Sequence, residues 1–175
     1  MKNPDPVRTS FERVVKAMER QSGVAKGSIL ARAVYKEGLA CEIECGPWKL
    51  TADMSPNAGG GGTSPTPGEI MSMALASCQV ITAVLWASKY EVPIGQLEVK
   101  VDVEKDSRGL YGVGGQPPHW KGVTYTMNVQ SPASESEIQK VLDAAFKYSP
   151  MRDNLEHPFA IAYKTNVTRP ERKHD

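Results

Sequence analysis

Residues 65–89 read PTPGEIMSMALASCQVITAVLWASK, and this stretch decides the fold. Thr66 and Glu69 have the spacing of a capping box and a proline stands at the first helical position, so a helix is predicted over about 67–89. Residues 70–88 carry no charged side chain over 19 positions, close to the length of a membrane-spanning helix. The run is nevertheless rich in alanine and contains serine, threonine and glutamine. We therefore predict a buried helix at the centre of a globular protein or oligomer.

Turns and short strands precede this helix. Residues 57–68 contain four consecutive glycines and two prolines, which neither a helix nor a strand ladder tolerates, so they are predicted to form a loop. Three segments compatible with β-strands are separated by turns and predict a three-stranded meander: 28–35, 39–45 and 48–53. At the start of the chain, a capping box over residues 9–12 predicts a short amphipathic helix that ends at a glycine.

The segments after the central helix alternate between strand and helix patterns. Residues 97–103 and 123–129 alternate apolar and polar side chains, which predicts an antiparallel hairpin with a long connection. A capping box that begins at Ser134 predicts another helix, which Pro150 ends. Residues 159–168 are predicted to form a last strand. This order of elements favours an α+β fold with antiparallel-rich sheets.

Length and composition limit the classes of protein that fit. A chain of 175 residues suits one domain, which we expect at 27–168, after an N-terminal helix and linker at 1–26 and before a charged tail at 169–175. The net charge is +1 and there is no basic patch, which argues against nucleic-acid binding. Three cysteines are too few for a disulfide scaffold, and the N-terminus lacks a secretory pattern, so we expect a reducing cytoplasm.

The three cysteines have different settings. Cys78 lies in the middle of the predicted central helix, where a thiol is either a small buried apolar group or a reactive one. Cys41 and Cys45 lie on one face of a predicted strand, about 13 Å apart, too far to bond each other. No second pair of cysteine or histidine ligands stands at zinc-finger spacing and the histidines are scattered, so no metal is expected.

Two motifs resemble those of a known superfamily. The sequence GGGGTSPTPGE at 59–69, running into ALASC at 74–78, is similar to the glycine-rich loop and cysteine helix of the osmotically inducible protein C and organic hydroperoxide resistance (OsmC/Ohr) superfamily. The resemblance implies an intertwined homodimer, in which sheets from both chains wrap around two long central cysteine helices. It also implies reduction of organic hydroperoxides or hydrogen peroxide by two cysteines, without a metal or organic cofactor.

The resemblance assigns roles to two residues of the reaction. Cys78 matches the peroxidatic cysteine, which attacks the peroxide as a thiolate and becomes a sulfenic acid. The resolving cysteine of the family stands before a proline, and Ser149 occupies that place here. A serine hydroxyl cannot form a disulfide, so turnover would require an external thiol, or Cys41 or Cys45 if either lies close.

The activating residues depart further from the family pattern. The resemblance makes Lys36 the nearest equivalent of the family's activating arginine, with Arg32 and Arg152 as further candidates, although lysine lacks the planar guanidinium fork. Glu69 lies one residue away from the position of the glutamate that orients this arginine. Glu69 is therefore either an orienting residue or only the capping-box residue of the helix.

The sequence thus supports a hydroperoxide reductase that uses Cys78 in oxidative stress, as a homodimer with an external thiol reductant and no nucleic-acid or membrane partner. The alternative is a catalytically reduced relative that binds a small apolar ligand or senses oxidants. In either case, several methionine, leucine and aromatic side chains are candidate pocket walls: Met71, Met73, Leu75, Trp86 and Tyr148.

Overall fold

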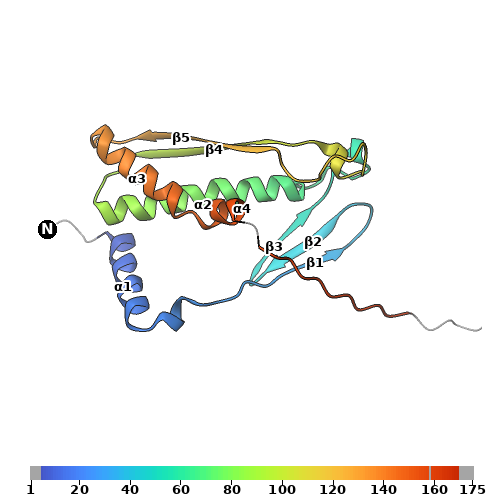
Figure 1. Ribbon diagram of the computed structural model, residues 1–175, viewed down its shortest axis with the longest axis horizontal. Coiled ribbons are helices and arrows are strands. Elements are labelled where there is room, and N and C mark those ends of the chain that lie inside the picture. The colour runs from blue at the N-terminus through green and yellow to red at the C-terminus, as the bar shows by residue number, and fades with distance from the viewer. Residues whose placement is uncertain (1–4, 158, 170–175) are drawn as a thin grey trace, which may run out of the picture.

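The computed structural model describes residues 5–157 and 159–169, and the chain has an α+β fold. The helices and strands follow one another as α1 (Pro6–Arg20), β1 (Ala31–Tyr35), β2 (Cys41–Cys45), β3 (Trp48–Ala52), α2 (Pro67–Tyr90), β4 (Gln96–Glu104), β5 (Gly122–Gln130), α3 (Glu135–Lys147) and α4 (Pro150–Glu156). Figure 1 shows α2 running through the middle of the molecule, with the long β4–β5 hairpin above it.

Helix α2 begins and ends as its sequence dictates. The Glu69 carboxylate accepts the Thr66 amide at 2.7 Å, while the Glu69 amide donates to the Thr66 hydroxyl at 3.3 Å, so both halves of the predicted capping box form. Glu91 ends the helix with a left-handed φ of 58°. By length and composition α2 could cross a membrane. In this fold, however, it packs against α1, α3, α4 and β4 and buries five of its side chains.

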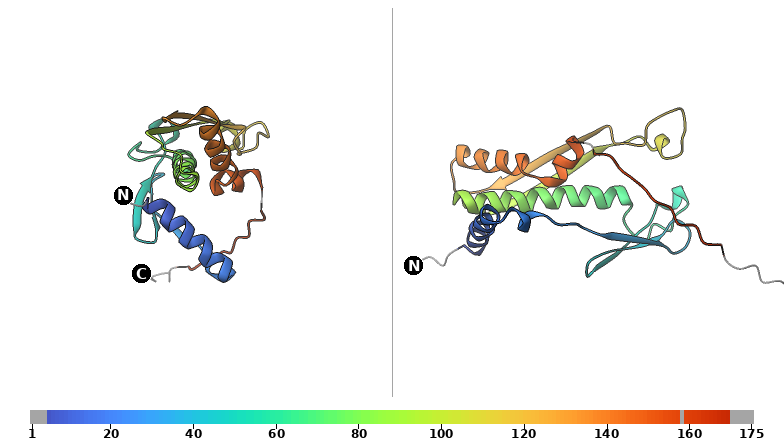
Figure 2. Two further views of the ribbon diagram at one scale, coloured as in Figure 1. Left: turned by 90° about the vertical axis from the view of Figure 1, so that its left-hand side faces the viewer. Right: turned by 60° about the horizontal axis from the view of Figure 1, so that its bottom comes forward.

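The strands form two separate antiparallel sheets, of which the β4–β5 hairpin packs on α2. Strands β4 and β5 pair over nine residues each, with Val101 opposite Tyr125, and their half-buried residues alternate with exposed ones. Strands β1, β2 and β3 form the predicted meander, in which Cys41 pairs with Tyr35 and with Ala52. The meander lies near the N-terminal end of α2, whereas α1 lies at the C-terminal end (Figures 1 and 2).

Aromatic side chains hold α1 against the C-terminal end of α2. The Phe11 ring meets the Trp86 ring edge-on at 5.7 Å, and the Lys89 ammonium lies 4.3 Å from the centre of the Trp86 ring. Trp86 in turn stacks on Tyr148 at 4.5 Å, with only 18° between the ring planes. The N-terminal helix is thereby connected, through one indole ring, to the junction between α3 and α4.

Two of the predicted boundaries were wrong. Helix α1 begins at Pro6 instead of Thr9, because the Asp5 carboxylate accepts the Val7 amide at 2.9 Å and caps the helix one turn earlier. The predicted last strand does not form, since residues 159–168 are extended and pair with no strand among the described residues. Most of the predicted tail, residues 170–175, lies outside the described part of the chain.

A buried carboxylate organises the glycine-rich loop before α2. Asp53 is 2% exposed and accepts the amides of Met54 at 2.7 Å, Gly61 at 3.0 Å and Thr63 at 3.2 Å. These amides, first that of Met54, hold the pKa of the Asp53 carboxyl below its usual value. Gly60 approaches the backbone so closely that a Cβ there would lie 2.0 Å from the Met54 carbonyl oxygen. Asp53 and this close approach hold the shape of the loop that leads into α2.

Candidate functional site

The central thiol meets a buried hydroxyl. Cys78 lies midway along α2, and its Sγ lies 3.4 Å from Oγ of Ser149, which is completely buried where α4 begins. Pro150 follows at the first position of α4, so the chain turns sharply here and directs Ser149 inward. The structure therefore brings together the two residues for which the resemblance implies the peroxidatic and resolving positions, 71 residues apart in sequence.

A tyrosine and an arginine complete the surroundings of the thiol. The Tyr125 ring of β5 meets the Phe146 ring of α3 edge-on at 6.2 Å, and the Arg152 guanidinium of α4 lies 4.7 Å from the centre of the same Phe146 ring. The pKa of Tyr125 is raised, first by burial and then by the charge of Cys78, while Arg152 acts in the opposite direction. Cys78 and Arg152 therefore both act electrostatically on the Tyr125 phenol.

An apolar pocket lies along the same elements. It has a volume of about 540 Å³, and its walls come from α2, α4, β5 and the connection before β5: Met71, Pro118, His119, Trp120, Lys121, Gly122, Val123 and Leu155. Met71 precedes Cys78 by seven residues, so both lie on one face of α2, about 10 Å apart. Val123 shares a face of β5 with Tyr125 in the same way. The pocket thus lies along the same faces of α2 and β5 as the thiol cluster, about two helical turns from Cys78, which does not line it.

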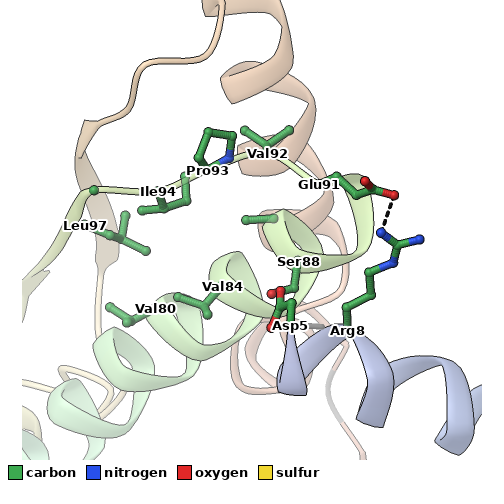
Figure 3. Close-up of a pocket in the computed structure, with 12 residues that line it drawn as sticks. Asp5, Arg8, Val80, Val84, Ser88, Glu91, Val92, Pro93, Ile94 and Leu97 are labelled. Carbon is green, nitrogen blue, oxygen red and sulfur yellow. Dashed lines mark ion pairs between the residues drawn. The ribbon is translucent and has the colours of Figure 1, made fainter. Parts of the chain in front are cut away.

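A second pocket, of about 780 Å³, lies at the other end of the central helix. Figure 3 shows apolar side chains of α2 and of the following turn, among them Val84 and Ile94, facing it. Asp5 and Arg8 of α1 border it, and Arg8 forms an ion pair with Glu91. Cys78 lines neither pocket, but Val80 and Val84 lie about 200° and 240° around α2 from it, so this second pocket opens on the other side of the helix.

The other predicted site residues do not meet the thiol within the chain. Lys36 lies after β1, and its ammonium binds the Glu42 carboxylate at 3.0 Å, which lowers the pKa of Glu42. Arg32 binds Glu44 at 3.1 Å. Glu69 folds back on its own capping box, about 13 Å along α2 from Cys78. Of the three basic residues considered from the sequence, only Arg152 lies at the cluster.

Neither a disulfide nor a metal site accompanies this cluster. Cys41, Cys45 and Cys78 are free thiols, and the first two are half-buried in the β2 strand. Over residues 5–157 and 159–169, no three histidine, cysteine, aspartate or glutamate side chains are grouped as a metal site would require. The reactive group of the cluster is the thiol of Cys78, and its polar neighbours are Ser149, Tyr125 and Arg152.

Comparison with known proteins identifies the family of the chain. Residues 59–164, from the glycine-rich loop to beyond α4, match the family described as OsmC-like protein. The chain belongs to this family. A protein of Mycoplasma pneumoniae named hydroperoxide reductase is 25% identical to this OsmC-like chain over 139 residues, which cover 78% of the chain and 92% of the relative.

Solved structures agree on the fold. An OsmC-like protein from Mycoplasma pneumoniae superposes with a TM-score of 0.66 at 21% identity, covering 75% of this OsmC-like chain and 89% of that one. An organic hydroperoxide resistance protein OsmC from Legionella pneumophila gives a TM-score of 0.57 at 17% identity, covering 74% and 89%. The arrangement of hairpin, central helix and meander is therefore that of the OsmC-like fold, as the sequence motifs predicted.

Proposed function

We propose that this chain is a thiol-dependent hydroperoxide reductase in which Cys78 is the peroxidatic cysteine. The family and the relative named hydroperoxide reductase support a peroxide-related function. The observation that carries the proposal is the 3.4 Å approach of the Cys78 sulfur to the Ser149 hydroxyl, inside a partly buried cluster beside an apolar pocket. We place the reaction in a reducing cytoplasm, where thiols are available.

The reaction proceeds in two stages. The Cys78 thiolate attacks one peroxide oxygen, the O–O bond breaks, and the other oxygen leaves as an alcohol after taking up a proton, which leaves a sulfenic acid on Cys78. Ser149 cannot form a disulfide with it, so an external thiol condenses with the sulfenic acid and releases water. A second thiol then displaces Cys78 and carries away the disulfide. No metal or organic cofactor takes part.

The pocket beside the cluster favours organic hydroperoxides over hydrogen peroxide. Met71, Trp120, Val123 and Leu155 offer apolar contacts for a hydrocarbon tail. Apolar surface buried by a tail is worth about 25 cal/mol per Å², whereas hydrogen peroxide has no tail to bury. The peroxide group of a substrate bound there would lie toward Cys78.

Removal of the thiol tests the function. In Cys78→Ala, consumption of cumene hydroperoxide in the presence of a dithiol or a monothiol is expected to fall to the rate without protein, because the two remaining thiols, Cys41 and Cys45, lie in the β2 strand and not in the cluster. Cys41→Ser and Cys45→Ser are matched controls that remove the strand thiols and are expected to retain wild-type rates. Equal peroxide consumption by wild type and Cys78→Ala would contradict the proposal.

We propose further that the chain works as a homodimer, with a second copy covering α2. Met73, Ile81 and Val84 leave one face of α2 apolar and exposed, with Ile81 67% exposed. Phe159, Ile161 and Tyr163 are also exposed, on the extended segment that forms no ladder among the described residues. A strand contributed to the sheet of a second copy would bury such side chains.

Sedimentation tests the assembly. Twice the 19.1 kDa of one chain is expected in analytical ultracentrifugation at micromolar concentration. Ile81→Glu places a charge on the exposed face of α2 and is expected to shift the equilibrium toward the monomer. Lys16→Glu, a charge change at an exposed position on α1, is expected to leave the dimer intact. A wild-type chain that stays monomeric would rule out this assembly.

Two observations favour a second candidate, a relative without turnover that binds a small apolar ligand. Ser149 replaces the resolving cysteine, and the larger pocket at the end of α2 is lined by Val80, Val84 and Leu97 without reaching Cys78. This candidate requires that wild type consumes no peroxide with either reductant. It also requires that an apolar fluorescent probe binds and that Val84→Trp, which fills the pocket, displaces it.

A further inference from the structure

Three buried polar atoms near the thiol lack a hydrogen-bond partner within the described residues. They are Oε1 of Gln79, the hydroxyl of Tyr125 and Nε of Arg152. Gln79 follows Cys78 on α2 and is completely buried. An unsatisfied buried polar group costs about 1–3 kcal/mol, and each one in a folded protein calls for an explanation. Three of them from three different elements around one thiol indicate a place prepared for a polar ligand.

The Arg152 side chain is held by contacts at both terminal nitrogens, while its buried Nε has no partner among the described residues. Its guanidinium packs on Phe146, one terminal nitrogen donates to the Lys147 carbonyl at 3.3 Å, and the other binds the Glu156 carboxylate. The side chain is only 13% exposed. These contacts hold the planar group in place and leave Nε as the donor that a bound oxygen could use.

The Tyr125 hydroxyl is buried, has no hydrogen-bond partner among the described residues and lies within electrostatic reach of Cys78. Its ring packs against the Phe146 ring, and the Arg152 guanidinium packs against the same ring, so Phe146 positions both polar side chains. Burial and the charge of Cys78 keep the pKa of the Tyr125 phenol above its ordinary value. The phenol therefore holds its proton at neutral pH and acts as a hydrogen-bond donor.

We propose that Tyr125 is the proton donor of the peroxide reaction and that its hydroxyl, together with Nε of Arg152, receives the leaving oxygen. The inference rests on the proposed function. As the Cys78 sulfur bonds to one peroxide oxygen, the electron pair of the breaking O–O bond moves to the other oxygen. That oxygen takes the Tyr125 proton and departs as the alcohol. The phenolate then regains a proton from water, and Arg152 offsets its charge in the meantime.

Tyr125→Phe tests the proposal, because it removes one oxygen and keeps the ring on Phe146. With cumene hydroperoxide, whose leaving alkoxide is strongly basic, the rate constant for oxidation of Cys78 is expected to fall by roughly 10²-fold or more. With 3-chloroperoxybenzoic acid, which releases a carboxylate that needs no proton, it is expected to change by less than about threefold. Alkylation of Cys78 by iodoacetamide, which also needs no proton donor, is expected to stay at the wild-type rate.

Tyr90→Phe is the matched control, since it removes a tyrosine hydroxyl at the C-terminal end of α2, away from Cys78, and keeps the ring beside Trp86. It is expected to oxidise like wild type with both peroxides. Two results would overturn the proposal in an active enzyme: Tyr125→Phe matching wild type with cumene hydroperoxide, or losing rate equally with both peroxides and iodoacetamide. If wild type itself reacts no faster than Cys78→Ala, the proposed function fails instead, which separates the two failures.

Discussion

Ser149→Cys is expected to form a disulfide with Cys78 as soon as one equivalent of peroxide is added. The Cys78 sulfur lies 3.4 Å from the serine oxygen, and a disulfide requires about 2.05 Å, so small side-chain rotations close the gap. A thiol held this close reacts as if it were far more concentrated than any external thiol. We expect the sulfenic acid to disappear at least about 10²-fold faster than in wild type with millimolar monothiol.

Mass spectrometry checks this result in a Cys41→Ser, Cys45→Ser background, in which only the two site thiols remain. The oxidised protein should lose two hydrogen atoms, resist dimedone and escape over-oxidation, whereas wild type should be trapped by dimedone. Ser136→Cys, on the exposed first turn of α3, is the matched control and should form no such bond. Ser149→Cys that stays reduced after the same treatment would show that the two positions are not neighbours in solution.

Gly60→Ala is expected to produce the largest loss of stability among single methyl additions in the loop before α2. The new Cβ would meet the Met54 carbonyl oxygen at 2.0 Å, and backbone atoms cannot move aside as a flexible side chain can. Overpacking costs about 1–3 kcal/mol, and a backbone clash belongs at the upper end of that range. At about 2–4 °C per kcal/mol for a chain of this size, the melting temperature should fall by roughly 6–12 °C.

Gly68→Ala is the matched control in the same segment. Gly68 lies in the first turn of α2, and an added Cβ there meets no atom within 4 Å. Alanine is a better helix former than glycine, so this variant should be more stable by about 0.5–1 kcal/mol. Scanning calorimetry of wild type and both variants measures the three melting temperatures. Equal melting temperatures for Gly60→Ala and wild type would contradict the described loop.

The sequence predicted correctly those helices and strands whose ends are marked by local motifs, such as capping boxes, or whose residues alternate between apolar and polar. The capping boxes at Thr66 and Ser134 fixed where α2 and α3 begin, and alternation fixed the β4–β5 hairpin. The predicted start of α1 at Thr9 was wrong because Asp5, which is followed by a proline at the first helical position, caps the helix earlier. The segment 159–168 has a strand-like pattern, but a strand also requires a neighbour, which no local pattern supplies.

The site was less predictable than the fold. Cys78 and Ser149 came from the resemblance of two motifs, and the structure placed them side by side. Tyr125 carried no signal beyond its place on the inner face of a strand, and Arg152 was one of several basic candidates. Their approach to the thiol depends on how β5 and α4 pack on α2, which no spacing along the chain encodes. Asp53 had a readable signal, a carboxylate between a strand and a glycine-rich loop.

The stack of Trp86 on Tyr148 gives this chain an internal optical probe. Tyr148 directly precedes Ser149, so a shift of Ser149 away from an oxidised sulfur moves the ring on which the indole rests. Indole emission depends on its contacts, and Trp86 also touches Phe11 and Lys89, whereas Trp48 lies 74% exposed on the separate meander. Under the proposed function, we therefore expect oxidation of Cys78 to change the emission of Trp86, against the background of Trp48 and of Trp120 in the pocket wall.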